Sequence, residues 1–209
     1  MNSKKRIFFL ILFFFCLAFV NFSSAEENTI TKLEEAYKNI NDAQGRFSQI
    51  SYLRDLDKTQ KFNGRFFIKG DKIRWQYTGD FPQVIYINKK TLTVYDKIRK
   101  QAIESTFDEK KYGQLPLALL SRVSVLKDDF EISQISKDTL VLIPKSKMGN
   151  IRKIELTLEE GDFPIKSLKV TDVQNNTVKV EFYSVKINKN LRDSIFKFVP
   201  QKDDTILRY

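Results

Sequence analysis

From Gly45 onward, apolar and polar residues alternate with a period of two along most of the chain. Successive side chains of a β-strand point to opposite faces, so this period predicts strands with one buried face and one polar face. Short polar turns separate the apolar runs, which is typical of an antiparallel meander. The sequence therefore predicts a mainly β protein whose consecutive strands lie side by side.

The strand pattern is clearest in two hairpins. Phe62–Ile68 and Ile73–Tyr77 flank a polar turn at Lys69–Asp71, and Val84–Ile87 and Thr91–Tyr95 flank a second polar turn. Further strands are predicted at 101–105, 130–135, 139–143, 151–158, 165–173, 178–187 and 195–199. About ten or eleven antiparallel strands result, and a sheet of that size curls or closes.

Two segments depart from the strand pattern. From Asn28 to Gln44 the apolar residues recur every three or four positions, which predicts an amphipathic helix that ends before Gly45. Such a helix either packs on the domain or lies on a membrane surface, and packing is the expectation. A leucine-rich insertion at Tyr112–Leu126, with Pro116 suited to a first helical turn, predicts a second helix.

The first 25 residues have the organisation of a secretory signal peptide. Lys4, Lys5 and Arg6 precede an uncharged apolar run at Ile7–Val20, which is too short to cross a bilayer as a helix. Small residues lead up to Ala25, so cleavage is expected before Glu26. Residues 1–25 are therefore assigned to the signal peptide and 26–209 to a single domain that is exported from the cytoplasm.

Composition narrows the chemistry of the mature chain. Cys16 lies within the signal peptide and the chain has no histidine, so disulfides, thiolate sites and the usual general base are missing. No nucleophile elbow, phosphate-binding glycine loop or metal-ligand cluster occurs, and neither an enzyme nor a cofactor is expected. The mature charge of about +7 is spread over every segment, and export argues against nucleic acid as a partner.

A curled sheet has a concave face, and two interpretations of that face remain open. It holds either a packed core or a cavity for an apolar ligand. The mature chain retains eleven Phe, eight Tyr and Trp75, but large aromatic side chains suit both alternatives.

The order of the motifs resembles that of the periplasmic outer-membrane lipoprotein carrier family of LolA type. The resemblance extends from Ile30 to Val199. The motifs that carry it are Gly45-Arg46-Phe47-Ser48-Gln49, Gly64-Arg65-Phe66-Phe67-Ile68, Ile73-Arg74-Trp75-Gln76-Tyr77, Lys90-Thr91-Leu92-Thr93-Val94-Tyr95-Asp96, Leu115-Pro116-Leu117-Ala118-Leu119-Leu120 and Phe196-Lys197-Phe198-Val199-Pro200.

The resemblance implies an incomplete, half-open antiparallel β-barrel with a hydrophobic concave face under a helical lid. It also implies a soluble monomeric chaperone that takes acylated lipoproteins from an inner-membrane ABC-transporter complex and passes them to an outer-membrane acceptor. Carried over by position, the candidate residues for the acyl-chain cavity are Phe47, Phe66, Ile68, Ile73, Trp75, Leu92 and Val94, and those for the lid are Leu117, Leu119 and Leu120. Each of them is also compatible with an ordinary core position.

One position departs from the family. An Arg-Pro pair is common before the strand that carries the tryptophan, and that arginine helps to hold the lid closed, whereas this chain has Lys69-Gly70. Lysine does not reproduce the planar contacts of arginine, so the role is not transferred to Lys69.

Three related functions remain as alternatives: a lipid or lipoprotein sensor, an outer-membrane acceptor, and a structural protein with a filled sheet. An acceptor is normally anchored through a cysteine after the signal peptide, and this chain lacks one. A sensor normally carries a second domain.

Overall fold

The computed structural model describes residues 23–108, 120, 123 and 126–209. The helical elements are α1 (Ser23–Lys38), η1 (Arg54–Leu56), α4 (Leu126–Asp129) and η3 (Asp193–Phe196). The strands are β1 (Ala43–Leu53), β2 (Lys58–Lys69), β3 (Lys72–Thr78), β4 (Gln83–Asn88), β5 (Thr91–Asp96), β6 (Gln101–Thr106), β7 (Phe130–Ser136), β8 (Thr139–Pro144), β9 (Ile151–Leu158), β10 (Ile165–Asp172), β11 (Thr177–Ile187) and β12 (Thr205–Arg208).

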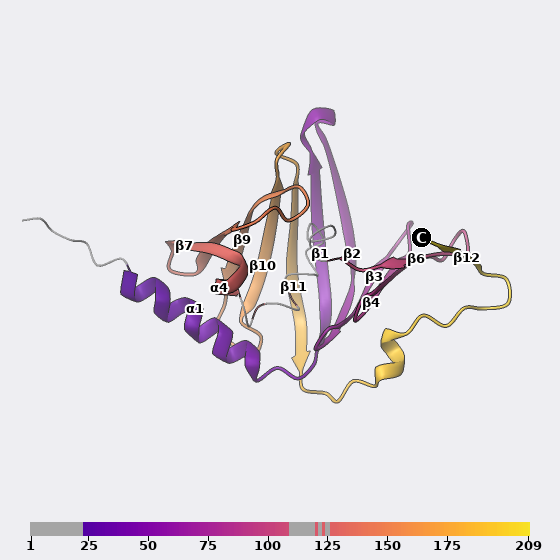
Figure 1. The fold of residues 1–209 in the computed structure, drawn as a ribbon, viewed down its shortest axis with the longest axis horizontal. Coiled ribbons are helices and arrows are strands. Elements are labelled where there is room, and N and C mark those ends of the chain that lie inside the picture. Colours follow the sequence, from indigo (N-terminus) through magenta and orange to yellow (C-terminus); the bar gives the residue numbers. More distant parts are fainter. Residues whose placement is uncertain (1–22, 109–119, 121–122, 124–125) are drawn as a thin grey trace, which may run out of the picture.

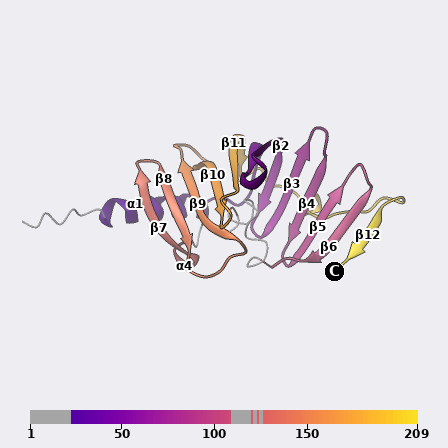
Figure 2. The same cartoon turned by 90° about the horizontal axis from the view of Figure 1, so that it is seen from above.

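Twelve strands of the described residues form one sheet, in the order β12-β6-β5-β4-β3-β2-β1-β11-β10-β9-β8-β7. Figure 2 shows them as a single row from β7 to β12. The two end strands do not pair with each other, so the sheet stays open, as the family resemblance implies for a half-open barrel. Long hairpin strands β1 and β2 project beyond their neighbours (Figure 1).

Strand β1 joins two antiparallel meanders, a first one of β2–β6 and a second one of β7–β11. It pairs with β2 on one side and with β11, which is more than a hundred residues later in the chain, on the other. The β1–β11 register shifts between Gln44 and Arg46, where Ser184 has a φ of 53°. A bulge bends its strand and increases the local twist, so this bulge contributes to the curl between the two meanders.

The two faces of the sheet differ in character. The inner face, which carries Phe47, Phe66 and Trp75, packs into one hydrophobic cluster with Ile30 and Leu33 of α1. The opposite, outer face carries the alternating polar side chains, and it holds a smaller apolar contact where the C-terminal segment crosses it.

The helix α1 is shorter at its C-terminal end than the sequence predicts. It ends at Lys38, and Ala43 and Gln44 already belong to β1. The turn is held by Asp42, whose carboxylate accepts hydrogen bonds from the backbone N–H groups of Lys189 and Leu191. The predicted helix over Asn28–Gln44 is therefore wrong in its last residues, because a partner from the far end of the chain stabilises the turn.

The C-terminal segment differs most from the prediction. The expected strand at Ile195–Val199 is wrong: η3 occupies its start, with Phe196 fully buried, and the Phe198 ring packs on Tyr86 and Tyr95. Strand β12 then pairs with β6 in parallel, an exception to the expected antiparallel meander. Figure 1 shows the segment running from the end of β11 around to the β6 edge. It covers the outer face of β4–β6.

The strand count also exceeds the prediction, because β1 and β12 were not among the expected strands. The other predicted strands and turns are present. The predicted helix at Tyr112–Leu126 lies mostly outside the described residues. Within this segment the structure describes Leu120, Val123 and Leu126, and all three are buried in the inner cluster. The signal peptide lies outside them too, except for Ser23–Ala25 at the start of α1.

Candidate functional site

Aromatic rings from four strands meet at the centre of the inner face. Phe47 of β1 stacks on Trp75 of β3 with ring centroids 3.9 Å apart, and Phe182 of β11 lies edge-on to Phe66 of β2 at 5.2 Å. All four side chains are buried. Stacked and edge-on pairs add to the stabilisation from area burial. The centre of the face is thus a closely packed apolar surface.

Two glycines make room for these rings. A Cβ on Gly45 would lie 2.8 Å from Cε1 of Phe66, and one on Gly64 would lie 2.5 Å from Cε1 of Phe47. Each glycine lies opposite the phenylalanine of the neighbouring Gly-Arg-Phe motif. The two motifs therefore fit together across the β1–β2 pair, which explains why a glycine precedes the Arg-Phe pair in both.

The structure brings most of the predicted site residues onto this one face. Ile68, Ile73 and Leu92 are buried in the inner cluster beside the aromatic centre, and Val94 is half-buried against it. Leu120 is fully buried in the same cluster. Leu117 and Leu119 lie outside the described residues.

Sequence reasoning missed the contribution of the second meander. Strands β8 to β11 supply a matching set of buried residues on the inner face: Leu140, Leu142, Ile154, Leu156, Leu168, Val180 and Phe182. The alternation of apolar and polar residues within β11 indicates that this strand has a buried face. Only the pairing of β1 with β11 shows that this buried face continues the face formed by β1–β5.

Polar side chains mark the end of the inner face nearest the β1–β2 hairpin. The Tyr77 hydroxyl donates a hydrogen bond to Oε1 of Gln49 at 3.0 Å, and Nε2 of Gln49 donates to Oγ of Ser51 at 3.0 Å. Burial raises the pKa of Tyr77, while the Trp75 indole and Gln49 oppose the shift. Tyr77 therefore stays protonated at neutral pH and acts as a donor.

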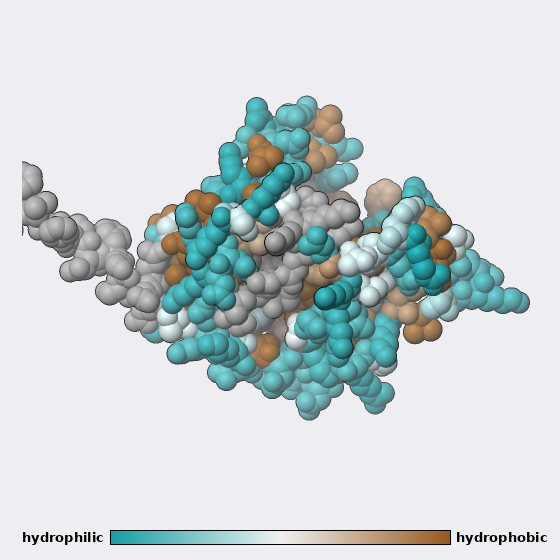
Figure 3. All heavy atoms as spheres, viewed as in Figure 1, coloured by the Kyte–Doolittle hydropathy of each residue, from teal (hydrophilic) through white to brown (hydrophobic). Residues whose placement is uncertain are grey.

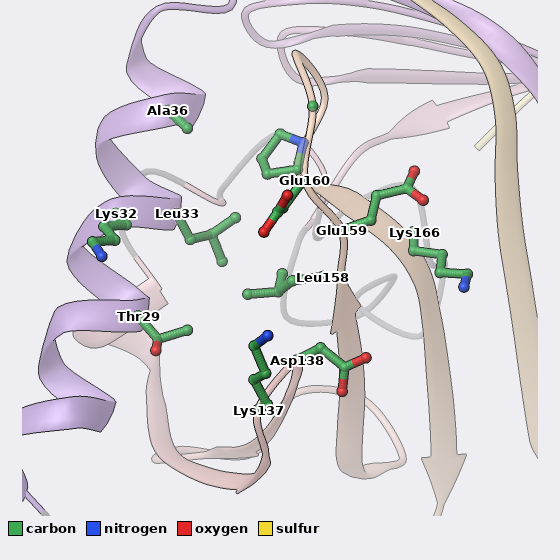
Figure 4. Close-up of a pocket in the computed structure, with 12 residues that line it drawn as sticks. Thr29, Lys32, Leu33, Ala36, Lys137, Asp138, Leu158, Glu159, Glu160 and Lys166 are labelled. Carbon is green, nitrogen blue, oxygen red and sulfur yellow. The ribbon is translucent and has the colours of Figure 1, made fainter.

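A groove separates α1 from the β7–β8 turn and the β9–β10 turn, and its volume is about 720 Å³ (Figure 4). Leu33 of α1 and Leu158 of β9 point toward each other across it. Its rim carries charges of both signs, including Lys137 and Glu160. Since Leu33 belongs to the inner cluster, the apolar floor of the groove is continuous with the inner face.

The structure places Lys69 against the C-terminal segment. Its ammonium group lies 2.9 Å from Oδ1 of Asp193 and donates a hydrogen bond to the Leu191 carbonyl oxygen at 2.8 Å. Lys72 binds the other oxygen of Asp193 at 2.9 Å. The two lysines hold the pKa of Asp193 down at about 2. The turn before the tryptophan strand thus fixes the segment that follows β11.

The visible exterior is mostly hydrophilic, with scattered hydrophobic side chains (Figure 3). Among the described residues, we find no helix long and apolar enough to cross a membrane. The same part of the chain contains no group of three or more side chains that could hold a metal ion. The buried apolar inner face and the groove beside α1 form the main candidate site.

Solved structures share this architecture. An uncharacterised conserved protein from Thermus thermophilus superposes with a TM-score of 0.54 at 13% sequence identity, covering 88% of this chain and 99% of that one. A LolA superfamily protein from Nitrosomonas europaea gives a TM-score of 0.50 at 13% identity, covering 83% and 97%. These two structures therefore share the fold of this chain.

Sequence comparison assigns the chain to a protein family. The model of the outer membrane lipoprotein carrier protein LolA matches residues 38–199, and the chain belongs to this family. An outer-membrane lipoprotein carrier protein of Coxiella burnetii is 30% identical over 219 residues, covering 100% of both chains. Its counterpart in Neisseria meningitidis serogroup C is 24% identical over 197 residues, covering 92% of this chain and 93% of that one. The resemblance drawn from the motifs is thus confirmed.

Proposed function

We propose that this protein is a soluble periplasmic carrier that moves lipoproteins from the inner to the outer membrane by covering their acyl chains. The observation that carries the proposal is the continuous apolar inner face, which two meanders build and α1 covers. Family membership and the names of the relatives support the same class of cargo. The task needs no catalytic group, so the chain is not an enzyme under this proposal.

The physical basis is the cost of exposing acyl chains to water. Each methylene that leaves water contributes roughly 0.8 kcal/mol, so shielding several chains makes an insoluble lipoprotein transportable. The chains insert between the inner face and its cover, displacing contacts that α1 and Leu120 make with the sheet. The groove beside α1 leaves part of this interface unpacked, so we expect the cover to be displaced at modest cost.

In this proposal the candidate residues have distinct roles. Phe47, Phe66 and Trp75 form the floor beneath the chains, and Ile68, Ile73, Leu92 and Val94 extend it toward β5. Leu117, Leu119 and Leu120 belong to the cover, with Leu120 seated on the inner cluster. An inner-membrane ABC-transporter complex delivers the cargo and an outer-membrane acceptor receives it.

The proposal is tested by native mass spectrometry of the full chain purified from the cell envelope. We expect a bound acylated species in the wild type and its loss in Leu120→Glu, which places a charge in the cover. Ile50→Glu is the matched control, because Ile50 is exposed on the outer face. A wild-type protein that is always free of lipid contradicts the proposal and favours the structural alternative.

Depletion in cells gives the second test. If the protein carries lipoproteins outward, its depletion leaves them in the inner membrane, and fractionation shows the shift. Unchanged lipoprotein distribution after depletion contradicts a carrier and favours the sensor alternative.

A further inference from the structure

A small groove lies at the end of the inner face, at the base of the projecting β1–β2 hairpin. Its volume is about 380 Å³, and its lining residues are Gln49, Gln60, Phe62, Tyr77, Phe81 and Gln83. Three of these side chains are primary amides and three are aromatic rings, and none is charged. The lining thus suits a ligand that is neutral, partly apolar and able to form hydrogen bonds.

The groove continues directly from the aromatic centre. The Tyr77 ring lies 5.5 Å from the Phe47 ring and 5.6 Å from the Phe62 ring, each edge-on. Phe47 in turn stacks on Trp75. An apolar chain lying on the inner face therefore reaches the amides of the groove without crossing a charged barrier.

Two buried donors at this end lack an acceptor. The Trp75 side chain is fully buried, and its indole N–H has no hydrogen-bond partner among the described residues. Gln49 is only 8% exposed, and its amide group has two N–H bonds, of which one is used on Ser51. A buried donor without an acceptor is costly, so Gln49, which lines the groove, favours a ligand that brings acceptor oxygens.

The two donors belong to one polar cluster. Tyr77 donates a hydrogen bond to Gln49. The Trp75 indole opposes the burial-induced rise in the pKa of the Tyr77 hydroxyl, although the geometry between the two groups is not that of a hydrogen bond. We call Gln49, Trp75 and Tyr77 the polar end of the inner face. Its three side chains come from β1 and β3, two of the four strands that carry the aromatic centre.

We propose that the polar end binds the ester carbonyl groups that join the acyl chains of the cargo to its glycerol head. This inference rests on the carrier function proposed above. Ester carbonyls accept hydrogen bonds and carry no charge, as the donors and the uncharged lining require. A phosphate or a free carboxylate would be buried in this groove without a cation, which is unfavourable.

The proposal assigns a direction to the bound lipid. The hydrocarbon lies on the aromatic centre, the carbonyls lie at Gln49 in the groove, and the head emerges beside the β1–β2 hairpin. The polypeptide of the cargo then leaves the carrier at the opposite end of the face from the Lys69 turn, which the C-terminal segment occupies.

The test compares two synthetic triacylated lipopeptides that differ only in having ester or ether links to glycerol. Trp75 is the single tryptophan of the chain, so its fluorescence reports binding to the full-length protein directly. We expect the wild type to bind the ester form roughly three- to tenfold more tightly, the effect of one or two neutral hydrogen bonds. Gln49→Leu should remove most of that preference.

The matched control is Gln76→Leu, which removes an amide from the outer face of the same region and should keep the preference. Tyr77→Phe is a second variant that retains the ring and removes only the hydroxyl that holds Gln49, so it should weaken the preference if Gln49→Leu fails to fold. Equal binding of both lipopeptides by the wild type overturns this inference and leaves the proposed carrier function intact. A preference for the ester form that survives Gln49→Leu has the same consequence. Failure of the wild type to bind either lipopeptide overturns both proposals.

Discussion

Replacing Gly64 by alanine is expected to destabilise the sheet strongly. A methyl group there would overlap the Gln76 backbone oxygen and would lie 2.5 Å from Cε1 and Cζ of Phe47. The Gln76 oxygen is fixed in the pairing of β2 with β3, and the Phe47 ring is fixed by its stack on Trp75. Neither neighbour is free to move away.

The expected loss in the free energy of unfolding depends on which atoms have to move to relieve the clash. Overpacking a well-filled core costs typically about 1–3 kcal/mol, and a clash with ladder backbone places Gly64→Ala at the upper end, about 3 kcal/mol. Gly45→Ala is the matched comparison, because its nearest contact is 2.8 Å to a Phe66 ring carbon and the next atoms are 3.1 Å away. Side-chain rotation accommodates most of that overlap, so we expect about 1 kcal/mol.

Urea unfolding followed by Trp75 fluorescence measures both values, and for a domain of this size a loss of about 3 kcal/mol lowers Tm by roughly 6–12 °C. An unfolding free energy for Gly64→Ala within about 0.5 kcal/mol of the wild type refutes the reasoning, since an unrelieved clash in a packed core carries a larger penalty. A greater loss of stability in Gly45→Ala than in Gly64→Ala refutes it equally.

Three further predictions concern polar contacts. Asp42→Ala leaves two backbone N–H groups without their acceptor, so we expect a loss of about 3 kcal/mol in unfolding free energy and faster hydrogen exchange at Leu191. Because the pKa of Asp193 is lowered from 3.8 to about 2, its contacts stabilise the fold above about pH 4 and are lost as the pH falls toward 2; a carboxylate NMR titration with a midpoint near 4 contradicts this. Arg65 lies directly opposite Arg46 on the neighbouring strand, and Arg65→Glu turns this like-charge pair into an opposite-charge pair. We expect the free energy of unfolding to rise by about 0.5 kcal/mol in low salt and by less in about 1 M salt, and a lower free energy of unfolding in urea melts contradicts this.

Local patterns predict most of the strands. The hairpin of β2 and β3 follows from alternating residues around a short turn, and Gly70 adopts the positive φ of 56° that such a turn favours. The apolar inner face follows from the same alternation. These features depend on residues close in sequence, so no knowledge of distant contacts is needed.

The features that sequence reasoning missed depend on distant contacts. Strand β1 begins at Ala43 because Ile68 and Ile187 flank it, and Ile187 lies far along the chain. Similarly, η3 forms where Phe196 is buried on the outer face, which a local apolar pattern does not distinguish from a strand. Gln49 and Tyr77 meet across β2, although 28 residues separate them.

The central claim is that acyl chains lie on the inner face, and site-specific photocrosslinking tests it most directly. Phe66 and Phe67 are adjacent phenylalanines of β2: Phe66 is fully buried on the inner face, and Phe67 lies on the outer face beneath Arg74. A photoreactive phenylalanine replaces each in turn, and the cells are irradiated. We expect acylated lipoprotein to crosslink at position 66 and not at 67. Equal crosslinking at both positions, or crosslinking at 67 alone, contradicts the account.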